Sequence, residues 1–390
     1  MKGFVLPEYN GRSITNIPGT VLRLFGIQNN LEPLAAPILN KLRGEYSSII
    51  FLIIDGVGFY RYRELKEQGV IPNLAGFNEE YLTSVFPSTT TAALTSLSTG
   101  VPPAKHGMLG FKLFLKDFGV TTNMISFRPW KIQVSLVENG LDPDEFVKER
   151  RVYSYLEEGY VKSYILIRNF YRNTPLSRVI YGSHETYGII NSVDLFTTIL
   201  KIHKKDKQKK FIVAYWGDTD TLAHRYGERS LEFELELRNL DFLLGETLKK
   251  LQGENVLFLI TADHGHIDTT PEKAIDLSED KFLQEEMVLP PGGEHRVVYL
   301  AVRNPEKVVK YLKEKYGDLA EVALREELEA RNLWGGELGD FSSRVGDVIL
   351  LARENNSFVY PENDEEKMMI GRHGGLSYEE MVVPFLWKRL

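Results

Sequence analysis

The chain has 390 residues, of which 43% are hydrophobic and 26% are charged, and this composition excludes a disordered or low-complexity protein. Its 47 Lys and Arg residues against 54 Asp and Glu residues give a net charge of −7, which argues against a nucleic-acid scaffold that works by neutralising phosphates. The sequence contains no Cys, which excludes disulfides, thiolate metal sites and a Cys nucleophile.

The hydrophobic segments of the chain are short. The best apolar run covers residues 49–54, whereas a membrane-spanning helix needs roughly 18 apolar residues, so we expect no membrane span. Pro7, Glu8 and Arg12 stand where a signal peptide would have its apolar segment. We therefore expect a cytoplasmic protein.

Apolar runs alternate with amphipathic helical patterns along the chain, which is typical of an α/β fold with a mostly parallel central sheet flanked by helices. The expected strands, in chain order, are Ser48–Asp55, Tyr160–Ile167, Phe211–Trp216, Val256–Thr261, Val297–Val302 and Val345–Leu351. Most of them are apolar throughout, as expected when helices cover both faces of the sheet. Leucines at three- and four-residue spacing predict a helix over 237–251, and Asn304 followed by Pro305 predicts the start of another.

The predicted organisation is a single domain, residues 1–390, because no linker or internal repeat marks a boundary. The segment 111–210 mixes aromatic residues, Pro and charge runs, and we expect it to form a cap inserted over a site. The block 269–347 contains two Gly-rich turns, at 290–293 and 334–336, and is a candidate for a second insertion.

Acidic and imidazole side chains follow three of the expected strands. Asp55 ends the first strand, Asp220 and His224 follow the strand 211–216, Asp263 and His264 follow the strand 256–261, and His373 lies in a later glycine-rich turn. The carboxyl ends of parallel strands meet at one edge of a sheet, where α/β proteins bind ligands. Three Asp and three His are also the donor types of a two-metal hydrolytic centre. The pattern therefore predicts such a centre at this edge.

Most of these segments also have an ordinary structural explanation when they are taken alone, whereas the adjacent pair Asp263-His264 at a strand end is hard to explain by structure. An Asp after a strand is a common loop residue, and Asp220 could be an N-cap followed by a surface His. Asp218 is a rival to Asp220 as a ligand, although the four-residue spacing from His224 favours Asp220. The other histidines are expected at the surface, in the core or in a supporting position; they are His106, His184, His203, His266 and His295.

A cluster of hydroxyl residues, Ser88 to Thr91, precedes a helical pattern that begins with small residues. The unsatisfied N–H groups and the positive dipole end of a helix start attract anions, so a hydroxyl there can attack a phosphoryl group and hold its oxygens. An ordinary Ser/Thr N-cap explains the same pattern.

In their order along the chain, these motifs resemble the type I phosphodiesterase/nucleotide pyrophosphatase family of the alkaline phosphatase superfamily. The resemblance is carried by Asp55, Phe86-Pro87-Ser88-Thr89-Thr90, Thr99-Gly100, His106-Gly107, Asp220 with His224, Asp263-His264-Gly265, and His373-Gly374. It implies an alkaline-phosphatase-like fold, a nucleophilic Thr90 and two divalent ions, most simply Zn²⁺. By this resemblance, one ion is bound by Asp55, Thr90, Asp263 and His264, and the other by Asp220, His224 and His373.

Two positions depart from the nucleotide-cleaving members of this family. Thr91 stands where those members tend to carry an aromatic residue that stacks on the base, and Phe111 stands where they carry an Asn that contacts a phosphate oxygen. The cap would then supply substrate contacts, and the candidates are Phe127, Arg128, Trp130 and Tyr171. Packing inside the cap explains the same aromatic residues.

The resemblance implies a metal-dependent hydrolase of phosphoric ester or pyrophosphate bonds that forms a phosphothreonine on Thr90 and has a small phosphoester as its partner. Alternatives within the superfamily are a phosphomonoesterase, a phosphonate hydrolase and a phosphomutase. A catalytically inactive metal-binding protein is a further alternative, although every expected ligand and the nucleophile are present.

Overall fold

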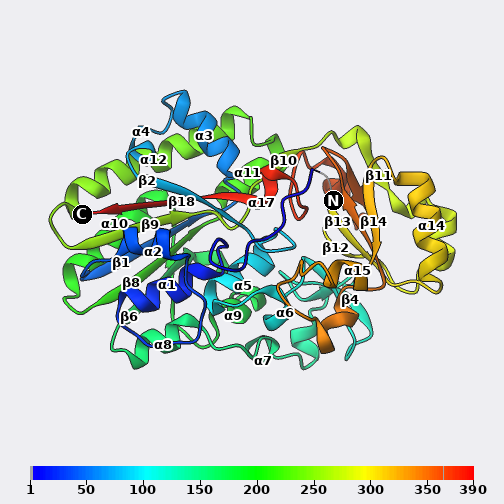
Figure 1. Ribbon diagram of the computed structural model, residues 1–390, viewed down its shortest axis with the longest axis horizontal. Coiled ribbons are helices and arrows are strands. Elements are labelled where there is room, and N and C mark those ends of the chain that lie inside the picture. The colour runs from blue at the N-terminus through cyan, green and yellow to red at the C-terminus, as the bar shows by residue number, and fades with distance from the viewer. Residues whose placement is uncertain (1–2, 363) are drawn as a thin grey trace.

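The computed structural model describes residues 3–362 and 364–390, whose elements form two lobes, each built on a seven-stranded sheet (Figure 1). The main sheet has the order β2-β18-β9-β1-β8-β6-β7. Its strands are β1 (Ser48–Ile54), β2 (Asn78–Thr83), β6 (Lys162–Arg168), β7 (Thr186–Ile189), β8 (Lys210–Trp216), β9 (Val256–Thr261) and β18 (Val382–Arg389). The strands from β9 to β7 are parallel, and β18 runs antiparallel to both of its neighbours.

Helices cover both faces of the main sheet (Figure 1). One face carries α10 (Ser192–Lys205), α11 (Asp218–Tyr226) and α12 (Leu231–Leu251), and the other carries α1 (Asn16–Leu24), α5 (Thr90–Thr99), α8 (Val152–Glu158) and α9 (Pro175–Tyr181). Shorter helices of this lobe are α2 (Ala36–Leu42), α3 (Phe59–Glu67), α4 (Pro72–Ala75), α6 (Pro103–His106), α7 (Pro143–Phe146) and α17 (Tyr378–Met381). Because helices cover both faces, every residue of β1, β8 and β9 is buried. The expected α/β class with a mostly parallel central sheet is confirmed.

The second sheet has the order β14-β15-β13-β12-β3-β4-β5, and each neighbouring pair is antiparallel. Its strands are β3 (Lys112–Leu115), β4 (Val120–Asn123), β5 (Arg128–Pro129), β12 (Gly292–Gly293), β13 (Val297–Leu300), β14 (Ala320–Leu324) and β15 (Val348–Ala352). The helix α14 (Pro305–Tyr316) packs on β14 and β15, and together they enclose a separate apolar core that contains Leu300, Val308 and Leu312.

The remaining elements of the second lobe are short. They are α13 (Lys281–Glu286), α15 (Arg325–Glu329), α16 (Asp364–Met368) and the parallel pair β11 (Ala274–Asp276) and β16 (Ser357–Val359). Within the described ranges, no helix combines the length and the apolar composition that crossing a membrane requires.

The sequence suggests two insertions, 111–210 and 269–347. The strands of the first are divided between the main sheet and the second sheet. Within 111–210, β3, β4 and β5 join the second sheet, whereas β6 and β7 belong to the main sheet. The expected strands at 297–302 and 345–351 exist as β13 and β15, but they pair in the antiparallel sheet rather than in the parallel one. The physical reason is that an apolar run predicts a strand without predicting its hydrogen-bonded neighbour.

Candidate metal centre

The carboxyl ends of β1, β8 and β9 lie at one level along the edge of the main sheet. The parallel register pairs Ile54 with Trp216 and Ile53 with Thr261, so the chain leaves the three strands together. Asp55 directly follows β1, α11 begins two residues after β8, and Asp263 lies two residues beyond β9. Acidic side chains from distant parts of the sequence therefore meet at this edge.

Three of these side chains, Asp55, Asp263 and His264, form what we call the first site, in which each offers a ligand atom within 4.8 Å of the others. His264 Nε2 lies 3.4 Å from Asp55 Oδ1 and 3.5 Å from Asp263 Oδ2, and the Thr90 hydroxyl lies 3.1 Å from the same nitrogen. Burial, together with the nearby carboxylates of Asp263 and Asp220, raises the pKa of Asp55 well above its usual range. The carboxyl groups of the first site thus resist ionisation together unless a cation compensates their charge.

Hydrogen bonds satisfy one oxygen of each carboxylate in the first site. Tyr215 donates to Asp55 Oδ2, and the backbone N–H groups of Gly56 and His264 donate to Asp263 Oδ1 at 3.3 and 3.0 Å. The other oxygens, Asp55 Oδ1 and Asp263 Oδ2, have no hydrogen-bond partner among the described residues although they are buried. Buried oxygens of this kind need a partner, and a divalent cation between them and His264 Nε2 would supply it.

A second group, Asp220, His224 and His373, forms what we call the second site. Asp220 lies in the first turn of α11 and His224 one turn later, so the two side chains share a face of the helix. Asp220 Oδ1 lies 3.3 Å from His224 Nε2 and 3.8 Å from His373 Nε2. Asp218, in contrast, forms a 2.9 Å ion pair with Arg168. The geometry therefore favours Asp220 over Asp218 as the ligand.

The histidines of the two sites are oriented in the same way, with Nε2 toward the centre. Their Nδ1–H groups donate to backbone carbonyls: His224 to Gly371 at 2.8 Å, His264 to Gly265 at 3.1 Å and His373 to Ser88 at 3.1 Å. A proton fixed on Nδ1 leaves the Nε2 lone pair available to a cation. Burial and the neighbouring imidazoles hold the pKa of His373 well below its usual value, so this ring is neutral and can act as a ligand.

One histidine that the sequence assigns to a packing or supporting position lies in the second site. His266 Nε2 is 3.1 Å from Asp220 Oδ1, and the ring belongs to the same group of potential ligands. The other four have partners elsewhere: His106 with Ser96, His184 with Ser154, His203 with Ser48 and His295 with Glu366. The sequence signal for His266 is its place after Gly265, two residues beyond His264 at the same strand end.

Thr90 lies at the N-terminal end of a helix that faces the first site. It is the first residue of α5, and Thr89 is the N-cap. The free N–H groups and the positive dipole end of α5 therefore lie beside the two clusters of ligands, where they can attract a phosphoryl group. The neighbouring Thr91 is buried and donates from its hydroxyl to the carbonyl of Gly110 at 2.9 Å.

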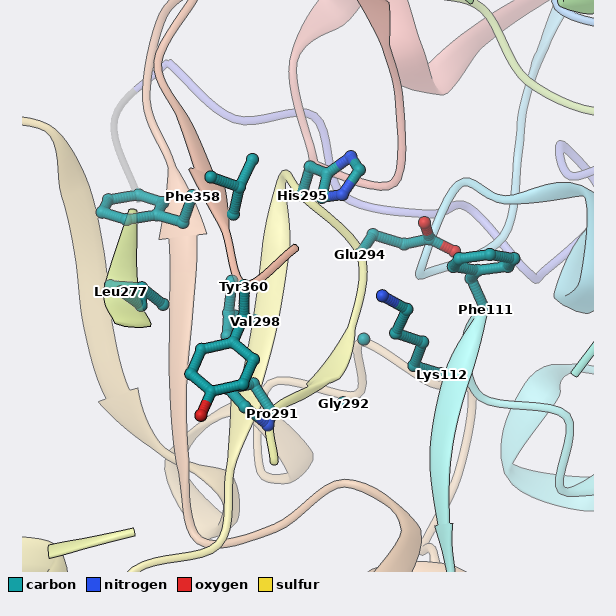
Figure 2. A pocket seen from close by; sticks show the side chains of 12 residues that line it. Phe111, Lys112, Leu277, Pro291, Gly292, Glu294, His295, Val298, Phe358 and Tyr360 are labelled. Atoms are coloured by element: carbon teal, nitrogen blue, oxygen red, sulfur yellow. The ribbon is translucent and has the colours of Figure 1, made fainter. Parts of the chain in front are cut away.

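A carboxyl group from the second lobe contacts the residue that precedes Thr90. Glu294 follows β12, and its Oε1 accepts a hydrogen bond from the Thr89 hydroxyl at 2.6 Å. Figure 2 shows Glu294 directed toward Phe111 and Lys112, with which it lines a small cavity of about 30 Å³. Burial raises the pKa of Glu294 to about 8. No sequence motif marks this residue, because it reaches the site from the other sheet.

In the metal-free protein, Glu294→Gln is expected to stabilise the fold increasingly as the pH rises. The pKa of Glu294 is about 8 in the folded chain against an ordinary value of 4.5. Its contribution to the free energy of unfolding is therefore fully present below about pH 4.5 and is lost as the pH rises through about 8. Gln cannot ionise and suffers no such loss.

Thermal unfolding in the presence of a chelator, from about pH 5 to about pH 9, measures this difference. Glu285→Gln, at an exposed position of α13, is the matched control. The same pH dependence in Glu294→Gln and in the unmodified chain would contradict the expectation.

An open pocket of about 560 Å³ adjoins Thr90 and Asp55. Its lining is largely apolar and aromatic, and includes Leu94, Val137, Ile167, Tyr171, Leu176, Ile180, Tyr181 and Tyr215, with Arg128 as the one cation among the described residues that line it. Of the substrate contacts expected from the sequence, Arg128 and Tyr171 thus face this pocket. Phe127 is fully buried and packs against Phe146 with ring centroids 5.5 Å apart, and Trp130 packs against Tyr360 at 5.3 Å.

A mostly parallel sheet with two groups of Asp and His at its strand ends, beside a Thr that begins a helix, is the arrangement expected of a two-metal hydrolytic centre in an α/β protein. The family model described as type I phosphodiesterase / nucleotide pyrophosphatase matches residues 49–376. The chain therefore belongs to this family of hydrolases, and the resemblance seen in the sequence is confirmed.

Relatives with curated sequences or solved structures are distant. An uncharacterized pyrophosphatase/phosphodiesterase from Schizosaccharomyces pombe is 22% identical over an alignment of 274 positions, which covers 65% of this chain, and the chain spans about half (52%) of that relative. Human ectonucleotide pyrophosphatase/phosphodiesterase 5 has a TM-score of 0.65 at 16% identity, with 87% of each chain covered. Phosphonoacetate hydrolase from Sinorhizobium meliloti has a TM-score of 0.64 at 18% identity, with 87% of this chain and 89% of that chain covered. These likenesses confirm the expected fold.

Proposed function

We propose that the chain is a two-metal phosphoesterase of the phosphodiesterase/nucleotide pyrophosphatase type that uses Thr90 as its nucleophile. One observation carries the proposal: the Thr90 hydroxyl lies 3.1 Å from His264 Nε2, at the start of α5 and beside two groups of buried ligands. A hydroxyl in this position can reach a phosphorus atom whose oxygens lie between the helix start and the two sites.

The proposed cofactors are two divalent cations, Zn²⁺ by preference, with one in each site. Asp55, Asp263 and His264 would hold the first together with the Thr90 oxygen, and Asp220, His224 and His373 would hold the second. Mixed carboxylate and imidazole donors suit Zn²⁺. When bound, the two cations would lower the pKa of the Thr90 hydroxyl and offset the charge that develops on the phosphoryl oxygens.

The protein groups then have separate tasks in the reaction. The Thr90 oxygen would form a bond to phosphorus while the bond to the leaving-group oxygen breaks, which gives a phosphothreonine that still carries the second ester group of the diester; water later hydrolyses it and releases the phosphate monoester. The N–H groups at the start of α5 would hold a non-bridging oxygen of the phosphoryl group. Tyr215 would keep Asp55 in its ligating orientation through the hydrogen bond to Oδ2.

We propose that the pocket beside Thr90 binds the ester group of a phosphodiester. Its volume of about 560 Å³ and its apolar, aromatic lining suit a nucleoside-sized or aryl group. An inactive threonine-to-alanine variant of murine ectonucleotide pyrophosphatase/phosphodiesterase 5 in complex with AMP has the same fold, and this supports a nucleotide ester. A phosphonate is the second candidate substrate, favoured by the likeness to phosphonoacetate hydrolase in complex with phosphonoacetate.

A substrate panel on the zinc-loaded protein tests the proposal. The panel contains a nucleoside aryl phosphodiester, a dinucleoside pyrophosphate, an aryl phosphate monoester and phosphonoacetate. We expect the diester or the pyrophosphate to have the highest kcat/KM. Faster turnover of the monoester or of phosphonoacetate would overturn the diester preference, and no hydrolysis of any of them would overturn the phosphoesterase function.

Arg128→Ala is expected to raise KM by about tenfold for substrates that carry an additional phosphate, with little change for a neutral aryl ester group. The physical reason is that Arg128 is the cation that lines the pocket, and a lost charge-assisted hydrogen bond costs about 1.5–3 kcal/mol. Lys131→Ala is the matched control, since Lys131 is a nearby cation whose Nζ lies over the Trp130 ring at 4.2 Å. Equal effects of the two substitutions in steady-state kinetics would contradict a role for Arg128.

A further inference from the structure

His266 is the fourth imidazole at the centre, and its Nε2 has no hydrogen-bond partner within the described part of the chain. The side chain is completely buried. Its Nε2 lies 3.1 Å from Asp220 Oδ1, which is also buried and without a hydrogen-bond partner among the described residues. Two buried polar atoms therefore face each other at close range, and neither has another hydrogen-bond partner among the described residues.

The orientation of the ring determines which nitrogen can accept a cation. His266 Nδ1 lies 3.1 Å from the carbonyl oxygen of Gly56, and because a carbonyl can only accept, Nδ1 carries the proton. Without a metal, a second proton on Nε2 can bridge this nitrogen to the carboxylate oxygen of Asp220; a divalent cation would replace that proton, because a ligating imidazole is neutral. A cation bound to both His266 Nε2 and Asp220 Oδ1 would give each atom a partner.

The backbone around His266 is arranged to admit the ring. Gly56 has φ +74°, and a Cβ there would lie 2.5 Å from His266 Cε1. On the other side, β10 (Ile267–Asp268) pairs antiparallel with β17 (Gly371–Arg372), and Ile267 lies opposite Arg372. His266 and His373 thus flank the same strand pair, with ring centroids 5.2 Å apart.

We propose that His266 Nε2 is a fourth protein ligand of the second-site cation, beside Asp220, His224 and His373. The inference rests on the two-cation centre of the proposed function. It gives the second site one carboxylate and three imidazoles, whereas the first site has two carboxylates, one imidazole and the Thr90 oxygen. With four protein ligands, a cation held here would have no free tetrahedral position, and a substrate oxygen could reach it only as a fifth ligand.

NMR spectroscopy of cadmium-substituted protein can count the imidazole ligands of each ion directly. In protein loaded with ¹¹³Cd²⁺ and labelled with ¹⁵N-histidine, a directly bound nitrogen shows one-bond coupling to the metal. We expect three histidine Nε2 atoms coupled to one cadmium and a single Nε2, that of His264, coupled to the other. Two couplings at the second site, with the His266 Nε2 uncoupled, would overturn the inference and leave the proposed function intact. Absence of any bound cadmium or zinc would overturn both.

Ion affinity supplies an independent measurement. His266→Asn can keep a donor for the Gly56 carbonyl but has no atom in place of Nε2, and we expect it to weaken binding of one of the two Zn²⁺ ions by at least about tenfold in competition with a chelator. His203→Asn, which removes a buried histidine that contacts Ser48, is the control and should keep both affinities. Unchanged affinity for both ions in folded His266→Asn would contradict the proposal.

Discussion

Thr90→Ala is expected to reduce kcat for a phosphodiester on the order of 10³-fold or more, because it removes the atom that attacks phosphorus. The change leaves the two groups of ligands in place, since Thr90 contributes only its hydroxyl, 3.1 Å from His264 Nε2 and 3.5 Å from Asp55 Oδ2. Binding of substrate should therefore persist while turnover is lost. Single-turnover kinetics on zinc-loaded protein separate these two effects.

Two further substitutions, one at Thr90 and one at the next residue, serve as controls for this prediction. Thr90→Ser keeps a hydroxyl and should retain activity within about tenfold, and Thr91→Ala removes an adjacent hydroxyl that is bonded to the Gly110 carbonyl instead. Acid quenching during turnover should leave one phosphoryl group, still bearing the second ester group of the substrate, on the peptide that contains Thr90, in the unmodified chain but not in Thr90→Ala. Full activity in Thr90→Ala would exclude the nucleophile assignment.

The second large effect is expected for a matched pair of substitutions on α11. Asp220→Asn should reduce kcat/KM by roughly 100-fold or more, because loss of a charged ligand weakens binding of the second-site cation. Asp218→Asn should change it little, because that carboxylate pairs with Arg168 at 2.9 Å. The two positions differ by only half a turn of one helix, so a general disturbance of α11 would affect both.

Metal analysis and thermal unfolding distinguish an effect on ion binding from an effect on folding. After dialysis against a weak chelator, Asp218→Asn should keep two ions per chain and Asp220→Asn only one. Added Zn²⁺ at about 1,000 times its Kd should stabilise a chain with an intact site by about 4 kcal/mol per site, and Asp220→Asn should gain correspondingly less. Equal metal content in both variants would remove Asp220 from the ligand set.

The part of this centre that follows strands of the parallel sheet could be predicted from the sequence. An apolar run that ends in Asp identifies a strand end, and parallel strands bring such ends together whatever their distance in sequence. Asp55, Asp220 and Asp263 each have this signature, and the structure brings all three to the same edge. The four-residue spacing of Asp220 and His224 likewise becomes a shared face of α11.

Other residues could not be found in this way, because their positions depend on how the two sheets pack. Glu294 reaches Thr89 from the antiparallel sheet, and no local pattern links residue 294 to residue 89. The Tyr215 hydroxyl donates to Asp55, but Tyr215 lies within the buried strand β8, where the sequence predicts only a core residue. His266 carried a readable signal, but two histidines in close sequence do not reveal whether the second faces the same centre as the first.

The proposed ligands of both sites and most of the lining of the pocket beside Thr90 come from different stretches of chain. The proposed metal ligands lie at residues 55, 220, 224, 263, 264, 266 and 373, whereas the pocket is lined mainly from 125–138 and 167–181, with Asp55, Thr90 and Asp220 at its inner end. Substitutions in those two segments, which include β5 and α9, can reshape the pocket while the proposed donor atoms stay in place. The choice of ester can therefore evolve, or be engineered, independently of the machinery that breaks the bond.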